Sequence, residues 1–169
     1  MVKENLNGNQ IEHVLIDDST YDGEIIAVSD IYDANDLNGK ETEKLRIGIR
    51  TSSGDVLPHF MTAIVSNAGE RNPKYRNSKL YDLLSSAGAL DIYNEGRDDI
   101  LQDRFSPTQQ NNLFVSFLRK VLVGRAVQIV TKTVTSASGE KYSVVDQMLG
   151  FIDTAVREET IQTQVAKTA

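Results

Sequence analysis

Hydrophobic and polar residues alternate along the first half of the chain. In 44–51 every second residue is apolar, and the positions between them hold Arg46 and Arg50. A period of two is typical of a strand with one buried face. Segments 20–32 and 56–66 are rich in β-branched and aromatic residues, so we predict strands there as well.

The middle of the chain has the periodicity of helices. Leucines recur at helical spacing after Ser78, a residue type favoured at N-caps, and predict a short helix that ends near Gly88. A second helix begins at Ser106, where Pro follows directly and Gln comes three residues later, the pattern of a capping box. This helix ends at Gly124, where a turn leads into the next strand. The segment 89–105 is acidic, and we interpret it as a connection.

Two more strands are predicted at 125–134 and 141–151, joined as a hairpin. An Asn38-Gly39 turn lies within a long acidic loop between the first two strands. The order predicts a mainly β fold with two short helices. It is the order of a five-stranded Greek-key barrel like the OB-fold, with the helical insertion between strands 3 and 4. A five-stranded sheet with helices on one side fits the same order.

The length of 169 residues predicts one folded domain. The polar ends have no core-sized apolar stripe, so we expect a flexible arm at 1–12, an OB-fold-like domain at 13–152 and a flexible tail at 153–169. No segment has the pattern of a signal peptide or a membrane span, and we expect a cytoplasmic protein without membrane contact. The chain has no Cys and two His. This composition disfavours disulfides, zinc centres and Ser-His-Asp catalysis.

The net charge of −6 argues against nucleic-acid binding, but its distribution does not. Residues 1–43 hold eleven acidic and two basic side chains, whereas 44–89 hold seven basic and three acidic ones. Residues 119–141 form a second basic stretch. Surface potential depends on faces rather than totals, so two basic stretches on one face would attract a polyanion. Scattered solvated charge is the alternative.

Two blocks of the sequence, 73-PKYRNSKLYDLLSSAG-88 and 122-LVGRAVQIVTKTVTSASGEKYSVV-145, resemble a pattern of phage and mobile-element proteins. The matching residues are Ser78, Lys79, Leu80, Tyr81, Leu83, Leu84, Gly88, Leu122, Val123, Gly124, Arg125, Gly139 and Tyr142. These proteins have an OB-fold and resemble single-stranded DNA-binding or replication accessory proteins. The resemblance implies the same fold and a role in replication or recombination.

The candidate nucleic-acid-binding residues fall into three groups. Cations interleaved with an aromatic residue within nine positions suit phosphate neutralisation and base stacking: Arg71, Lys74, Tyr75, Arg76 and Lys79. In an OB barrel the second and third strands form the usual oligonucleotide face, which would hold Arg46 and Arg50. The loop between the last two strands is the other usual contact, flanked by Lys132 and Lys141. A solvated loop and ordinary exposed arginines are the alternatives.

The predicted function is therefore non-catalytic binding of single-stranded DNA, with RNA as a possible second ligand and with protein partners or self-association in addition. No catalytic motif, metal-ligand set or cofactor-binding loop is visible, so we expect neither an enzyme nor a cofactor. The alternative is a structural or assembly β-barrel that binds other proteins of a phage or complex. A carbohydrate-binding domain is disfavoured because Trp is absent.

Overall fold

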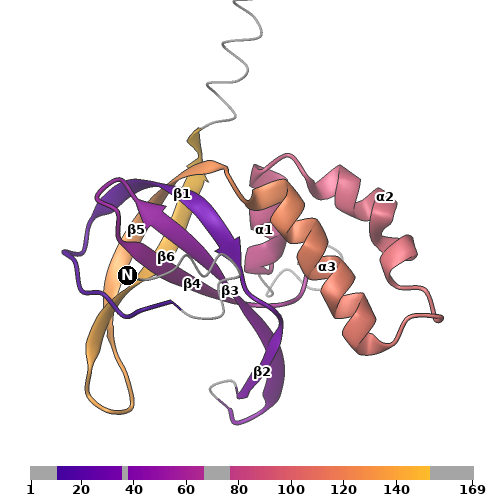
Figure 1. Cartoon of the computed structure of the whole chain (residues 1–169), viewed down its shortest axis with the longest axis horizontal. Helices are drawn as coiled ribbons and strands as arrows, with labels where there is room; N and C mark the ends of the chain where they lie inside the picture. Colours follow the sequence, from indigo (N-terminus) through magenta and orange to yellow (C-terminus); the bar gives the residue numbers. More distant parts are fainter. Residues whose placement is uncertain (1–10, 36–37, 67–76, 153–169) are drawn as a thin grey trace, which may run out of the picture.

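The computed structural model describes residues 11–35, 38–66 and 77–152, and within these the fold is mainly β with three helices (Figure 1). The strands are β1 (Thr20–Val28), β2 (Tyr32–Asn35), β3 (Glu41–Thr51), β4 (Val56–Thr62), β5 (Ala126–Thr135) and β6 (Lys141–Phe151). The helices, which all fall between β4 and β5, are α1 (Lys79–Ser86), α2 (Leu90–Ile100) and α3 (Pro107–Leu122).

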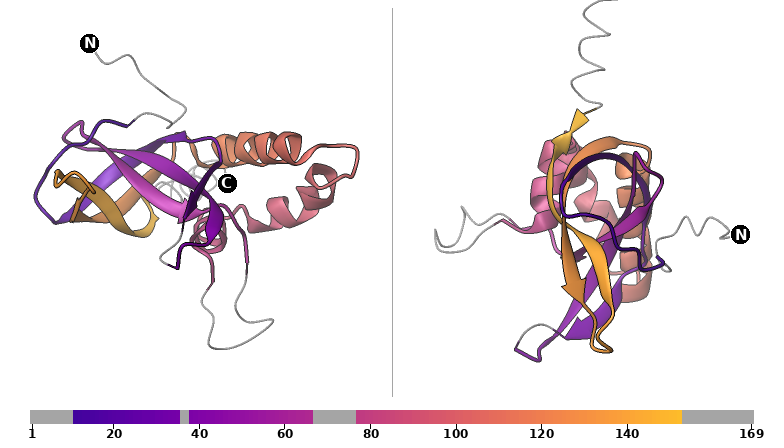
Figure 2. Two further views of the ribbon diagram at one scale, coloured as in Figure 1. Left: turned by 90° about the horizontal axis from the view of Figure 1, so that it is seen from below. Right: turned by 90° about the vertical axis from the view of Figure 1, so that its left-hand side faces the viewer.

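The six strands form one antiparallel sheet. Its hydrogen-bonded order is β2-β3-β1-β5-β6, and β4 pairs with β3 off this path. The helices gather on one side of the strands in Figure 1, and the view from below in Figure 2 shows α2 and α3 extending away from the sheet. The helices contact the sheet through α1 on β4 and α3 on β1.

Alternation along the strands builds the core. Leu45, Ile47 and Ile49 of β3 are fully buried. The helices add leucines at helical spacing to the same core, among them Leu80, Leu84, Leu118 and Leu122. Burying side chains of this size is worth roughly 1.5–3 kcal/mol each relative to exposure. The sheet and the helices thus share one continuous core.

The number of strands differs from the predicted five. Segment 20–32 is not one strand, because β1 ends at Val28 and Tyr32 starts the separate β2. The buried Ser29 stands at the break, where its hydroxyl donates to the Asp30 carbonyl and accepts from the Arg46 backbone N–H. The predicted acidic loop is largely a β2–β3 hairpin, with Gly39 at φ 79° in its turn.

The number of helices was also wrong, since α2 occupies part of the predicted connection 89–105. This helix has no side-chain N-cap and several acidic residues, so local signals do not favour it. Tertiary packing stabilises it instead, because the Tyr93 ring contacts Phe114 and Phe117 of α3 with centroids 5.9 Å apart in each pair. Packing of this kind routinely overrides weak propensity.

The other helix and hairpin boundaries were predicted correctly. Ser78 caps α1 by accepting from the Tyr81 backbone N–H at 3.1 Å. Ser106 and Gln109 form the predicted capping box of α3, with bonds of 2.8 and 3.2 Å. Gly124 has φ 91°, which lets the chain turn from α3 into β5.

Candidate nucleic-acid interface

The outer face of β3 and β4 holds the central cation of the candidate site. Arg46 lies between two core residues of β3, so its side chain faces away from the core, and Phe60 of β4 is its cross-strand partner. Tyr32 of β2 pairs with the neighbouring Lys44. The register of three strands therefore places two aromatic side chains and two cations on one surface.

Arg46 is flanked by both aromatic rings. Its guanidinium carbon lies 5.0 Å from the ring centroid of Tyr32 and 6.0 Å from that of Phe60. Burial raises the pKa of Tyr32, while the Arg46 charge acts in the opposite direction. The Nε of Arg46 is buried, and no residue in the described part of the chain accepts a hydrogen bond from it. A buried donor without an acceptor costs roughly 1–3 kcal/mol, and a ligand that accepts a hydrogen bond from it would remove this cost.

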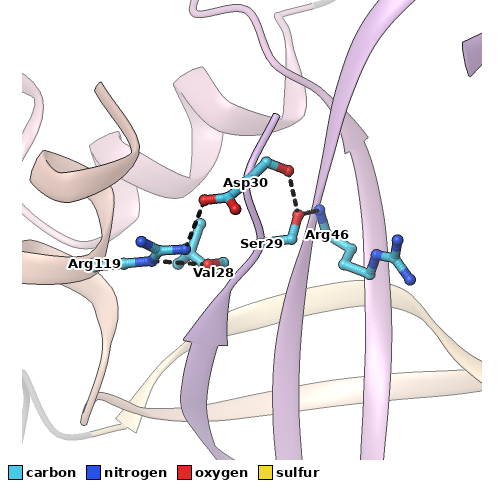
Figure 3. Close-up of polar contacts among 5 residues, drawn as sticks. All are labelled: Val28, Ser29, Asp30, Arg46 and Arg119. Carbon is cyan, nitrogen blue, oxygen red and sulfur yellow. Dashed lines mark hydrogen bonds and ion pairs between the residues drawn. The ribbon is translucent and has the colours of Figure 1, made fainter. Parts of the chain in front are cut away.

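The backbone around Arg46 is held rigidly from the opposite side. Arg119 of α3 donates from Nε to the Val28 carbonyl at 2.9 Å and forms an ion pair with Asp30 at 3.1 Å. The Ser29 hydroxyl, between Val28 and Asp30 in the sequence, accepts from the Arg46 backbone N–H at 2.9 Å. In Figure 3 the Arg46 side chain extends away from Arg119. Arg119 thus fixes the β1 end, and Arg46 remains directed outward.

The two basic stretches meet beside this cluster. Lys79, the first residue of α1, donates from Nζ to the Phe60 carbonyl at 3.4 Å. Burial lowers the pKa of Lys79, and the charges of Lys132 and Lys44 lower it further, whereas Asp146 raises it. Lys79 therefore lies within electrostatic reach of cations from both stretches.

The acidic residue nearest these cations is already engaged. Asp146 of β6 forms an ion pair with Lys132 of β5 at 3.2 Å, and both side chains are about half exposed. An exposed pair of this type contributes little, about 0–1 kcal/mol. A phosphate group competing for Lys132 would therefore displace only a weak interaction.

His59 and Phe60 face opposite sides of β4, and the structure shows which of the two side chains is exposed. His59 is 5% exposed, and Phe60 is the half-exposed residue on the outer face. Burial lowers the pKa of His59 to about 4, and the nearby charge of Lys79 acts in the same direction. The ring Nδ1 lies 3.2 Å from the Val145 carbonyl oxygen.

Three predicted site residues thus share one area: Arg46, Lys79 and Lys132. Two others lie elsewhere on the sheet. Arg50 stands further along β3, opposite Val56 and Glu24. Lys141 begins β6 at the tip of the β5–β6 hairpin, opposite Thr135.

The remaining predicted residues lie outside the described part of the chain: Arg71, Lys74, Tyr75 and Arg76. The residues on either side of this segment are joined to each other. Ser78 donates its backbone N–H to the Ser66 carbonyl at 3.0 Å, and its hydroxyl accepts from the Ser66 N–H at 3.0 Å. Ser66 is therefore held together with Ser78, the residue next to Lys79 in the sequence.

Part of the outer face of β3 is covered by the segment that precedes β1. The Cδ1 of Ile11 lies 3.4 Å from the place that a Cβ on Gly48 would occupy. Further along, the His13 ring stacks on Tyr142 with centroids 3.9 Å apart and planes 4° apart. Ile11 separates the Arg46 end of β3 from the Arg50 end, so the cluster around Arg46 is the continuous part of the candidate interface.

Sequence reasoning missed the aromatic pair. Tyr32 and Phe60 were included in the predicted strands 20–32 and 56–66 without a role in binding. Alternation along a strand gives the two faces but not which of them is covered. The available signal was the turn at 52–54 between β3 and β4: with Thr51 opposite Asp55, where the Thr51 N–H donates to the Asp55 carbonyl at 2.8 Å, the register pairs Phe60 with Arg46.

Two concave regions lie near the fold's helical side. A cavity of about 190 Å³ lies between α1, β4 and β6 and includes His59 and Lys79 in its wall. A groove of about 580 Å³ runs between α2, α3 and the segment after β4, where Ile64 and Leu101 are exposed. Within the described ranges, no three His, Asp or Glu side chains gather as a metal site.

Comparison with known proteins identifies no relative. No protein-family model matches the chain, and no curated protein is similar to it. No helix in the described part of the chain is long and apolar enough to cross a membrane.

Proposed function

We propose that the chain binds single-stranded nucleic acid, DNA in the first place, on the outer face of β3 and β4, without catalysis. The observation that supports this most strongly is the Arg46 guanidinium between Tyr32 and Phe60, whose Nε has no acceptor among the described residues. Aromatic rings beside cations are what an unpaired strand requires, because its bases need stacking surfaces and its phosphates need positive charge. In duplex DNA the bases are stacked inside the helix, so a duplex would gain only the interaction of its phosphates with the cations.

The proposed mechanism divides the residues by role. Phe60 and Tyr32 offer ring faces on which successive bases stack. Lys44, Lys79 and Lys132 neutralise phosphates along the same path, and Arg46 reaches a phosphate or a base edge with its free donors. Stacking and phosphate contacts tolerate most sequences, so this surface has little sequence preference of its own.

We also propose that the sheet is an OB-fold-like barrel. The order β4-β3-β1-β5-β6, with β4 lying against β6 and the helices inserted between β4 and β5, is the neighbour relation expected of that fold. On this assignment β2 is an extra strand in the first loop. β3 and β4 then correspond to the second and third barrel strands, the usual oligonucleotide face.

The resemblance to phage and mobile-element proteins leads to the same biological proposal. A binder of single strands acts where duplex DNA is opened, as in replication or recombination, and we propose that role in the cytoplasm. RNA remains part of the proposal as a ligand, because stacking and phosphate neutralisation do not depend on the sugar. A partner protein also remains part of the proposal.

Fluorescence anisotropy with labelled oligo-dT tests the proposal. The wild-type chain should bind oligo-dT more tightly than a duplex of equal length, and the affinity should fall steeply with salt. Phe60→Ala should weaken binding by about 1–3 kcal/mol through lost stacking. Arg46→Met removes the charge but keeps most of the side-chain length, and should reduce the salt dependence.

The matched control is Lys120→Ala, which removes an exposed cation from the last turn of α3. Its affinity should equal that of the wild type. Equal binding of duplex and single strand, or equal losses in Lys120→Ala and Phe60→Ala, would contradict the proposed interface.

A second candidate function, docking of a protein partner, is favoured by the groove between α2 and α3. Ile64 and Leu101 line this groove and are 51% and 49% exposed. Exposed apolar surface of this kind is typical of a site that binds another protein. The groove lies on the helical side, whereas the cation-aromatic cluster lies on β3 and β4. Docking of a partner at the groove is therefore compatible with strand binding.

A further inference from the structure

The cavity between α1, β4 and β6 is built differently from the outer face beside it. Its lining combines the apolar side chains of Leu83, Met148 and Phe151 with polar ones, among them His59, Lys79 and Asp146. An apolar wall with a few polar groups is the usual design of a pocket for a small planar group. The question is which hydrogen bonds the polar side offers.

His59 offers an acceptor. The Val145 carbonyl oxygen can only accept a hydrogen bond, so the neighbouring Nδ1 must be the protonated nitrogen. A neutral imidazole with hydrogen on Nδ1 has a lone pair on Nε2. Because burial keeps this ring neutral at pH 7, Nε2 is a hydrogen-bond acceptor on a residue of the cavity wall.

The carboxylates in the wall point to the same chemistry. Asp82 accepts from the Asn77 side-chain amide at 3.1 Å, and Asp146 is paired with Lys132 at 3.2 Å. Each carboxylate has further lone pairs to offer. The two carboxylates also disfavour entry of a phosphate, and Lys79 in the same wall donates its Nζ to the Phe60 carbonyl at 3.4 Å. The cavity therefore favours a neutral group that donates hydrogen bonds.

We propose that this cavity receives one base of the bound strand and selects bases with an exocyclic amino group. The inference rests on the proposed function, because the strand brings the base to the rim at Lys79. Cytosine presents an amino donor at the position where thymine and uracil present a carbonyl acceptor. Two acceptors facing each other repel, so thymine and uracil fit this wall poorly.

Oligo-dC and oligo-dU of equal length test the selection, because their bases differ only at position 4, amino against carbonyl, and at the adjacent N3, an acceptor in cytosine and an N–H donor in uracil. The wild-type chain should bind labelled oligo-dC roughly fivefold more tightly or better, the discrimination that one good base contact supplies. His59→Phe keeps an aromatic ring at this position but removes the acceptor, and should bring the two affinities together.

A second variant blocks the cavity without removing any contact. Gly150 lines the cavity, and a Cβ built on it meets no atom within 4 Å. Gly150→Leu should abolish the preference for oligo-dC while oligo-dU affinity stays unchanged. Gly96→Leu is the matched control, since Gly96 of α2 also has open space around a Cβ but lies outside the cavity.

The outcomes separate the two proposals. Equal wild-type affinities for oligo-dC and oligo-dU, or a preference that survives in folded Gly150→Leu, would overturn the base pocket and leave strand binding intact. Failure to bind either oligonucleotide at low salt would overturn the proposed function and the pocket with it. Circular dichroism of each variant shows whether it is folded.

Discussion

Individual residues in this chain gain their roles from neighbours in space. Arg46 alternates with buried residues of β3, so its outward direction follows from the sequence alone. Its position between Tyr32 and Phe60 does not, because the three residues lie on three strands and only the pairing register brings them together. His59 is a similar case, since its acceptor role depends on the Val145 carbonyl of a distant strand.

The buried His59 should make stability depend on pH. Its pKa is about 4 in the folded chain against 6.5 when exposed, so the unfolded chain takes up a proton first as the pH falls. The free energy of unfolding is therefore unaffected by protonation of His59 above about pH 6.5, and it decreases as the pH falls toward 4. Urea unfolding should show the wild type losing about 2 kcal/mol between pH 7 and pH 5 relative to His59→Phe. Parallel pH profiles of the two proteins would show that His59 is not buried as described.

Among the elements, those with strong local signals were predicted well. α1 and α3 have N-caps and apolar stripes, and the β5–β6 hairpin has a glycine turn with φ 86° at Gly139. α2 was missed because its stability comes from Tyr93 packing against α3 rather than from its own sequence. The break after Val28 was missed because the bonds of Ser29 replace regular pairing there.

The capping box of α3 provides a test at this level. Ser106→Ala removes the acceptor for the Gln109 backbone N–H and should cost about 1 kcal/mol of unfolding free energy. Ser116→Ala makes the same chemical change at an exposed position within α3 and should leave stability equal or slightly higher. Urea unfolding of both variants measures the difference. Equal effects would mean that the box contributes nothing to α3.

For the whole molecule, the sequence indicated that two basic stretches exist but not that they meet. Lys79 comes from the first stretch and Lys132 from the second, and the antiparallel sheet with α1 beside β4 brings them into electrostatic reach. Lys79 and Lys132 are far apart in the sequence, and no local pattern predicts the long-range packing that brings them together. The acidic total charge is compatible with a basic face for the same reason.

The most direct test of the account is an NMR titration of the isotope-labelled chain with oligo-dT. Shifts in backbone amide signals should concentrate on the outer face of β3 and β4, at Tyr32, Arg46 and Phe60, and at Lys79 beside it. The signals of Tyr93 and Arg97, which line the groove of α2 and α3, should not move. Perturbations confined to that groove, or no perturbation at low salt, would contradict a single-strand interface on β3 and β4.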